Sequence, residues 1–222
     1  MEKKVELKEK KVINSMLLFI RKNLSLIILL FGMIGFLALA NQVFSKELLT
    51  IDVVGYNLIS KYLMCDFITA IFKFITNCGD SICLISITIL TFILIKNKNI
   101  GLSITCNLIV ITLFNLLLKN IFQRPRPLEY RIINATGYSF PSGHSMVSMA
   151  FYGFIMYLIY KYVKNKKLKW ILIGFLMILT IFIGVSRIYL GVHYTSDVLA
   201  GFLFSCAYLM LYIKVVKKYV LK

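Results

Sequence analysis

Long uncharged stretches alternate with short basic segments along this chain of 222 residues. A helix needs about 20 residues to cross the ~30 Å apolar core of a membrane. Six stretches approach or reach that length without a charged side chain, and they cover residues 24–45, 81–95, 100–118, 145–160, 170–186 and 198–213. None has the two-residue alternation of a membrane barrel strand. The pattern therefore predicts an all-α integral membrane protein with six transmembrane helices.

The segment between the first two uncharged stretches has a different pattern. Its apolar residues recur at helical spacing, and they are Ile51, Val54, Leu58, Ile59, Tyr62 and Leu63. This spacing predicts an amphipathic interfacial helix that lies on the outer membrane surface. The same pattern also allows part of residues 46–77 to belong to the second transmembrane helix, and it does not fix that boundary.

The composition agrees with a membrane protein. Hydrophobic residues make up 59% of the chain and the mean hydropathy is +0.83, whereas soluble domains are closer to half apolar. We expect one membrane domain over residues 23–217, with short basic tails at residues 1–22 and 218–222.

The positive charge is distributed unevenly between the two ends of the predicted helices. The net charge is +17, a surplus that in a soluble protein would favour nucleic-acid binding. Eighteen of the 26 lysines and arginines lie in the two tails and in the loops after the second and fourth helices, and eight lie on the other side. The positive-inside rule then predicts that both termini are cytoplasmic. Because the basic residues frame the helices in this way, we expect no nucleic-acid partner.

The five cysteines do not form a metal-binding or redox motif. They are Cys65, Cys78, Cys83, Cys106 and Cys206, and none lies in a CxxC pair or near a histidine at zinc-ligand spacing. Small apolar residues within helices are the simplest interpretation, and a Cys65–Cys78 disulfide remains open. We expect no metal and no cofactor.

A first polar cluster ends the third predicted helix. It contains Lys119, Arg124 and Arg126, and prolines follow both arginines. Arginine offers a rigid fork that matches phosphate oxygens, and lysine offers a mobile charge. The prolines would end the helix and keep the arginines outside it. The alternative is that these cations only anchor the helix end at the interface.

A second cluster, residues 139–144, begins the fourth predicted helix. Ser142 is a good N-cap residue, and Gly143 lets the backbone approach an anion closely. A helix amino terminus presents free N–H groups and a positive dipole end, which favour phosphate. The alternative is an ordinary helix cap followed by a surface residue, His144.

A third cluster, residues 186–197, lies between the last two predicted helices. It contains Arg187, and it contains His193 and Asp197 at a spacing of four. On a helix this spacing puts both side chains on one face, where a carboxylate fixes the tautomer of the imidazole and increases its basicity. The alternative is a local hydrogen bond at the interface. His144 and His193 are the two histidines of the chain, and the predicted topology puts both at outer helix ends.

The three clusters together resemble the signature motifs of the type 2 phosphatidic acid phosphatase (PAP2) superfamily. The matching segments are Lys119-x6-Arg126-Pro127, Pro141-Ser142-Gly143-His144 and Ser186-Arg187-x5-His193-x3-Asp197. The six-helix plan of the family covers nearly the whole chain. The superfamily also contains soluble haloperoxidases with the same pocket, but six apolar stretches favour the membrane branch. Residues 122–127 and 137–140 are similar to small bacterial members that act on phosphatidylglycerophosphate, phosphatidic acid or undecaprenyl diphosphate.

The resemblance implies a reaction and a role for each motif residue. His193 would attack phosphorus with Asp197 as its activating carboxylate, and His144 would protonate the leaving oxygen and then activate water. The phosphoryl oxygens would be held by Lys119, Arg126, Ser142, Gly143 and Arg187. We add Arg124 and Arg131 as candidates for contacts to a second phosphate or to a head group. The expected substrate is therefore a lipid phosphate in the bilayer, hydrolysed at the extracytoplasmic side.

Two other functions are compatible with parts of the pattern. A catalytically silent family member could act as a membrane scaffold or lipid-binding protein, but the intact His144, His193 and Asp197 argue against it. A transporter would be expected to have polar groups in the middle of the membrane and broken helices. The uncharged stretches disfavour that function. The sequence predicts neither the lipid nor the oligomeric state.

Overall fold

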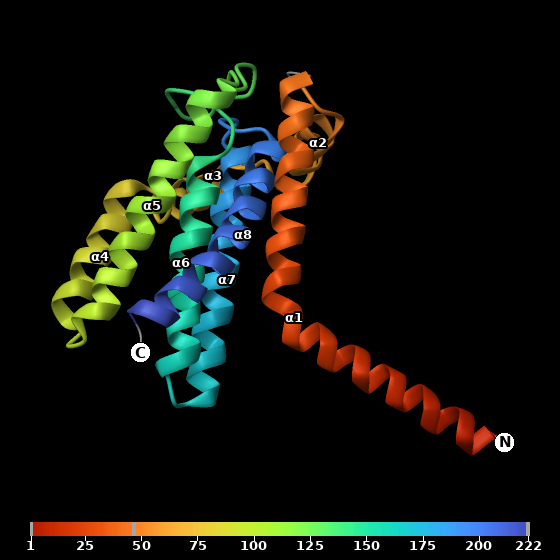
Figure 1. Cartoon of the computed structure of the whole chain (residues 1–222). Coiled ribbons are helices and arrows are strands. Elements are labelled where there is room, and N and C mark those ends of the chain that lie inside the picture. Colours follow the sequence, from red (N-terminus) through yellow and green to blue (C-terminus); the bar gives the residue numbers. More distant parts are fainter. Residues whose placement is uncertain (1, 46–47, 221–222) are drawn as a thin grey trace.

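The computed structural model describes residues 2–45 and 48–220, and the regular secondary structure in this part is all helical (Figure 1). The helices are α1 (Glu2–Ser45), α2 (Thr50–Leu63), α3 (Asp66–Asn77), α4 (Ser81–Leu94), α5 (Lys98–Phe122), α6 (Gly143–Tyr162), α7 (Lys166–Tyr189) and α8 (Thr195–Tyr219). Each uncharged stretch of the sequence lies within one helix, apart from one residue at the end of the second stretch. Several helices extend beyond these stretches through lysines, which are good helix formers.

Asparagine caps begin two of the long helices. The side chain of Asn97 accepts a hydrogen bond from the backbone N–H of Asn99 (3.0 Å) at the start of α5. Asn165 does the same for Leu168 (3.1 Å) at the start of α7. These caps satisfy N–H groups that have no partner inside the helix.

Among the residues that the structure describes, four helical segments are long and apolar enough to cross a membrane. They are Leu18–Ser45, Lys98–Phe122, Lys166–Tyr189 and Thr195–Tyr219. Helices α3 and α4 meet at a bend of 48° and meet the same criteria only as a pair, which would make five. Helix α6 is not among these candidates, since its sequence contains His144 and several serines and tyrosines. The predicted count of six crossings therefore stays a prediction.

Residues 48–77 form two helices rather than one. Helix α2 directs Ile51, Val54 and Leu58 outward, and each is 40–54% exposed, while its one acid, Asp52, is buried. Helix α3 continues through a tight turn into α4, as the alternative interpretation of the sequence allowed. An interfacial position for α2 agrees with its exposed apolar residues and stays a prediction, and residues 46–47 lie outside the described part.

Helix α6 forms the centre of the bundle, between α5, α7 and α8 (Figure 1). Its residues Met146, Ala150 and Phe154 are fully buried, and they pack in one core cluster with Ile111 of α5 and Ile183 of α7. A helix covered by protein on several sides needs less apolar surface than one that faces lipid. This position explains why the composition of α6 is the least membrane-like of the long helices.

Helix α1 lies along α8, and its amino-terminal part extends away from the bundle (Figure 1). A Cβ atom on Gly32 would lie 2.6 Å from the backbone oxygen of Leu203, so the two backbones are close because Gly32 has no side chain. The domain boundaries predicted at residues 22 and 217 fall inside α1 and α8. The basic tails are therefore helical continuations of these two helices as far as the described residues extend.

Candidate active site

The three polar clusters meet at one end of the bundle, where α5 and α7 end and α6 and α8 begin. They line a cavity of about 420 Å³. The motif residues at its wall are Lys119, Arg126, Gly143, His144, Arg187 and His193. The turn between α3 and α4 and residues 133–136 of the α5–α6 loop complete the wall. Segments far apart in the sequence thus form a single pocket with three cations and two imidazoles.

Arg126 is held at the cavity by backbone carbonyl groups. Its Nε donates to Gly137 O (2.9 Å), one terminal nitrogen to Thr136 O (3.0 Å), and the other to Val192 O (2.9 Å). The nitrogen that contacts Val192 also lies 2.9 Å from Nε2 of His193. Gln123, with φ 46°, ends α5 in the left-handed region and starts the irregular segment that carries Arg126. The guanidinium is therefore fixed by the loop, and it faces His193.

This contact assigns the tautomer of His193. A guanidinium can only donate hydrogen bonds, so Nε2 of neutral His193 accepts and the proton is on Nδ1. Nδ1 lies 3.3 Å from Oγ of Ser139 and 3.4 Å from Oδ2 of Asp197. Nε2 thus carries a lone pair at the cavity wall, as a nucleophile requires.

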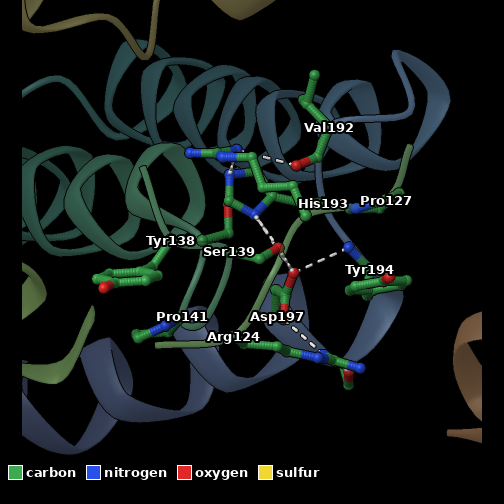
Figure 2. Close-up of polar contacts among 12 residues, drawn as sticks. Arg124, Pro127, Tyr138, Ser139, Pro141, Val192, His193, Tyr194 and Asp197 are labelled. Carbon is green, nitrogen blue, oxygen red and sulfur yellow. Dashed lines mark hydrogen bonds and ion pairs between the residues drawn. The ribbon is translucent and has the colours of Figure 1, made fainter. Parts of the chain in front are cut away.

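Ser139 lies between the imidazole and the carboxylate (Figure 2). Its hydroxyl donates a short hydrogen bond to Oδ2 of Asp197, and the backbone N–H of Tyr194 donates to the same oxygen (2.9 Å). Ser139 and Asp197 are both fully buried. The sequence predicted Asp197 beside His193, and the structure brings them together. Ser139 belongs to the second cluster of the sequence, but it had been given no role there. A serine directly before the Phe-Pro-Ser-Gly-His segment was the available signal.

Burial and charge both favour neutral His193. Burial lowers the pKa of its imidazole well below the usual range, and the positive charges of Arg126, Lys119 and Arg187 lower that pKa further. His193 is 3% exposed and lies in the loop between α7 and α8. The neutral, nucleophilic form is therefore the resting form at neutral pH.

Arg124, a candidate for contact with a second phosphate or a head group, lies away from the cavity. Arg124 is 3% exposed and does not line the cavity. One terminal nitrogen lies 2.7 Å from Oδ1 of Asp197, and the other lies 2.7 Å from Oδ2 of Asp52 on α2. Its guanidinium also stacks over the ring of Tyr194, 4.1 Å from the centroid. Two buried carboxylates hold the guanidinium away from the cavity, because a buried charge needs partners of opposite sign.

Arg131 is exposed, and its Nε donates to Pro127 O (2.6 Å). It lies outside the lining of the cavity. A head-group contact by Arg131 stays a prediction.

His144 has a carboxylate partner of its own. Its Nε2 lies 2.7 Å from Oδ1 of Asp80, in the turn between α3 and α4. Asp80 also lines the cavity, and its side chain is about half exposed. Asp80 was not predicted from the sequence, because the two residues are 64 positions apart. The sequence offered one signal for Asp80. It lies directly before the second uncharged stretch, on the side of the membrane where the three motifs are predicted.

Lys119 and Arg187 bring two more cations to the cavity. The ammonium of Lys119 donates to Tyr138 O through a short hydrogen bond. Arg187 donates to Oγ1 of Thr76 (2.7 Å), and its buried Nε has no hydrogen-bond partner among the described residues. A buried N–H without a partner is costly, so Arg187 is suited to an anion that would accept from it.

The start of α6 adds backbone N–H groups. Gly143 lines the cavity, where a Cβ would lie 3.0 Å from the amide oxygen of Asn115. Ser142 is the N-cap of α6 and is fully buried, with its hydroxyl 3.0 Å from Oγ of Ser145. Ser142 does not line the cavity. Its contact with a phosphoryl oxygen therefore stays a prediction, whereas Gly143 is placed at the wall.

The arrangement suits a tetrahedral anion flanked by a nucleophile and a proton donor. Fixed cations and a helix amino terminus stabilise negative charge that develops during phosphoryl transfer. Two imidazoles with separate carboxylate partners can perform different steps. The fold and the site thus define a helical membrane protein with a cationic pocket at one end that is suited to a phosphate group.

Comparison with known proteins identifies the family. Residues 100–220 match the family model described as PAP2 superfamily. The chain belongs to the PAP2 superfamily, in its branch of membrane lipid phosphatases, and it is a multi-pass membrane protein.

Two curated relatives match parts of the chain. Phosphatidylglycerophosphatase B of Bacillus subtilis is 39% identical over 94 residues, which cover 40% of this chain and 45% of that protein. An undecaprenyl-diphosphatase of Sulfolobus acidocaldarius is 28% identical over 138 residues, which cover 59% of this chain and 62% of that protein. The matched segments thus span about half of the length of these relatives.

Two solved structures have a similar fold. The transmembrane PAP2-type phosphatidylglycerolphosphate phosphatase of Bacillus subtilis has a TM-score of 0.78 and 26% identity, covering 86% of this chain and 96% of that one. LpxE of Aquifex aeolicus has a TM-score of 0.60 and 24% identity, covering 74% and 97%, a likeness that shows the fold alone.

Proposed function

We propose that this protein hydrolyses a phosphomonoester or diphosphate of a membrane lipid through a phosphohistidine intermediate on His193. The observation that carries the proposal is the convergence of three cations and both histidines on one cavity. The proposal is also supported by the lone pair of His193 Nε2 at the cavity wall and by the membership of the chain in a family of phosphatases.

In the first step, Nε2 of His193 forms a bond to phosphorus while the bond from phosphorus to the leaving oxygen breaks. The leaving oxygen takes the electron pair of that bond and a proton from His144. Nδ1 of His193 keeps its proton, so the ring gains a positive charge, which the carboxylate of Asp197 stabilises. As the substrate binds, the N–H of Arg126 that contacts Nε2 of His193 donates its hydrogen bond to a phosphoryl oxygen instead.

In the second step, His144 takes a proton from water and the water oxygen attacks phosphorus. The nitrogen–phosphorus bond breaks, its electron pair returns to Nε2, and inorganic phosphate leaves. Lys119, Arg126, Arg187 and the Gly143 N–H hold the phosphoryl oxygens in both steps, with Ser142 as a further candidate. These cationic side chains have the role that Mg²⁺ has in other phosphoryl-transfer enzymes, so we propose that the reaction is independent of metal ions.

We further propose six membrane crossings, formed by α1, the bent pair α3–α4, α5, α6, α7 and α8, with residues 23–217 as the membrane domain. Helix α2 lies on the outer interface. Both termini are cytoplasmic, because eighteen of the 26 basic residues are on that side. The cavity then opens on the extracytoplasmic side, where it would meet lipid phosphates of the outer leaflet.

The substrate class is supported by the relatives and by the surroundings of the cavity. The names of the two curated relatives specify a phosphatidylglycerophosphate and an undecaprenyl diphosphate. Large apolar side chains are exposed along the helices, among them Phe31 (71%) and Ile93 (65%). The bundle therefore presents a lipid-compatible surface, and phosphatidylglycerophosphate, phosphatidic acid and undecaprenyl diphosphate are the candidate substrates.

Purified full-length protein in detergent micelles tests the proposal. We expect phosphate release from at least one of these three lipids, resistance to EDTA, and inhibition by vanadate, which mimics five-coordinate phosphorus. Lys119→Gln should lower kcat by about 10²-fold, since it removes one charge that stabilises the transition state. Lys73→Gln, at an exposed lysine of α3, is the matched control and should leave kcat unchanged. Folded protein that releases no phosphate, or activity lost in EDTA and restored by Mg²⁺, would contradict the proposal.

A further inference from the structure

Asp52 is a buried carboxylate on a helix whose apolar residues are mostly exposed. Its side chain is completely inaccessible, although α2 carries Ile51, Val54 and Leu58 on its outer surface. Burying a carboxylate is costly unless it is hydrogen-bonded and paired. The contacts of Asp52 therefore determine which face of α2 turns toward the bundle.

The hydrogen-bond partners of Asp52 lead to the nucleophile. Oδ1 accepts from the backbone N–H of Ser196 (2.8 Å), at the start of α8. Oδ2 accepts from the backbone N–H of Leu49 (3.1 Å) and from Arg124 (2.7 Å). Asp52 thus contacts the residue directly before Asp197 and also the guanidinium that binds Asp197.

Arg124 is a bridge between two carboxylates. Its two terminal nitrogens each lie 2.7 Å from a carboxylate oxygen, one of Asp52 and one of Asp197. The three groups carry a net charge of −1. If Arg124 faced Asp197 alone, the guanidinium would cancel the charge of the carboxylate that His193 needs. Because Asp52 shares the guanidinium, a net negative charge remains beside the imidazole.

This charge matters because His193 is otherwise surrounded by positive groups. The charged and titratable groups that face it are Arg126, Lys119, Arg187, His144 and Asp197. Three of these five groups are permanent or near-permanent cations. Phosphorylation of Nε2 places one more positive charge on the ring, so the carboxylate side must supply the compensation.

We propose that Asp52 of α2 is a positioning residue for the nucleophile, acting through Arg124 and Ser196 on Asp197 and so on His193. It holds the start of α8 by the Ser196 N–H, and by sharing Arg124 it leaves the group of Asp52, Arg124 and Asp197 with a net negative charge beside His193. The inference rests on the proposed phosphohistidine reaction. It also gives the interfacial helix α2 a direct connection to the catalytic groups.

Asp52→Asn in the full-length protein tests the inference. The amide keeps the shape of the side chain and removes its charge. We expect kcat to fall at least tenfold with KM changed less than threefold. The acid limb of the kcat/KM pH profile should move to lower pH, since losing a negative charge makes His193 harder to protonate. Asp52→Glu, which restores the charge, should return the acid limb toward the wild-type position.

Asp66→Asn is the matched control, because Asp66 is an exposed acid at the start of the neighbouring helix α3. Its kcat and pH profile should equal those of the wild type. Rates are expressed per vanadate-binding site, so that unfolded protein does not contribute. If Asp52→Asn gives no folded protein, Arg124→Lys replaces it, since one ammonium cannot bridge both carboxylates as the guanidinium does, and the same fall in kcat is expected.

Each result has a distinct meaning. An Asp52→Asn variant with the kcat and the acid limb of Asp66→Asn overturns the inference, as does an Arg124→Lys variant with wild-type kcat. A fall in total activity that disappears when rates are expressed per site would also overturn it, because that result shows a purely structural role. Failure of the wild type to hydrolyse any lipid phosphate would instead refute the proposed function.

Discussion

Arg124 and Arg126 are two residues apart and carry the same charge, but they have different tasks. Arg126 is held by three backbone carbonyls and faces His193, so its charge remains available to an incoming anion. Arg124 is neutralised by carboxylates on either side. The first arginine can bind phosphate, and the second stabilises the position of the acid behind the nucleophile.

The low pKa of His193 predicts the pH dependence of the reaction. The nucleophile must be neutral, and the neutral fraction rises with pH through the pKa. Because burial and neighbouring cations lower that pKa, the acid limb of kcat/KM should lie below pH ~6.5, the value for an ordinary histidine. The profile of the purified wild type, corrected for the ionisation of the substrate itself, measures this limb. An acid limb at or above ~6.5 would show that His193 is not held in its neutral form.

The candidate site was predictable from the sequence where chemistry and local spacing define it. Lys119, Arg126, Gly143, His144, Arg187 and His193 line one cavity, and each had been assigned to the site from its motif. The contacts of Ser139, Asp80 and Asp52 were not predicted, since they join residues 54 to 144 positions apart. The contacts of Arg124 with Asp52 and Asp197 could not be predicted for the same reason. Two arginines in an irregular segment have equal charge, and only the fold decides which of them meets the buried acids.

At the level of helices, the sequence predicted the uncharged stretches well, but it did not predict how residues 46–77 divide into helices. Each uncharged stretch became a helix because a long apolar run without proline has no other way to satisfy its backbone in a membrane. The segment of residues 46–77 was ambiguous, because the amphipathic spacing of α2 continues into α3. Its division into two helices depends on contacts of α3 with α7, such as the hydrogen bond between Thr69 and Tyr189.

The packing of α1 against α8 predicts the effect of a single methyl group. Gly32→Ala places a Cβ 2.6 Å from the backbone oxygen of Leu203, so the helices must separate, at a cost of about 1–3 kcal/mol. Gly174→Ala in α7 is the matched control, because a Cβ at that position would have no neighbouring heavy atom within 4 Å. The thermal midpoint of the purified full-length variants should fall for Gly32→Ala and should hold or rise slightly for Gly174→Ala. Equal midpoints would mean that α1 is not closely packed on α8.

For the whole molecule, the orientation in the membrane follows from charge and determines where the reaction occurs. We expect a cysteine at Tyr138, in the α5–α6 loop, to react with an impermeant thiol reagent in intact cells. A cysteine at Lys166, at the start of α7, should react only after the cells are permeabilised. Both positions are exposed in the structure, and the five native cysteines are replaced in both variants. The opposite labelling pattern would overturn the topology and the charge count on which it depends.

The central claim is that phosphate is transferred to His193 while His144 transfers protons. An activated aryl phosphate needs little help from an acid to leave, so His144→Ala should still form the phosphoenzyme from it. The same variant should hydrolyse that phosphoenzyme slowly, because the second step needs His144 as a base, and general acid–base catalysis contributes about 10²–10⁴-fold. The intermediate should therefore accumulate.

Rapid alkaline quench of the wild type and of His144→Ala with ³²P-labelled aryl phosphate, followed by tryptic mapping, measures this directly. Arg187 and Lys214 bound the peptide that contains His193, and Arg131 and Lys161 bound the peptide that contains residue 144. We predict acid-labile label on the His193 peptide in both proteins, with a larger amount in His144→Ala. Label on the His144 peptide of the wild type, or no acid-labile label in either protein during turnover, would contradict the account.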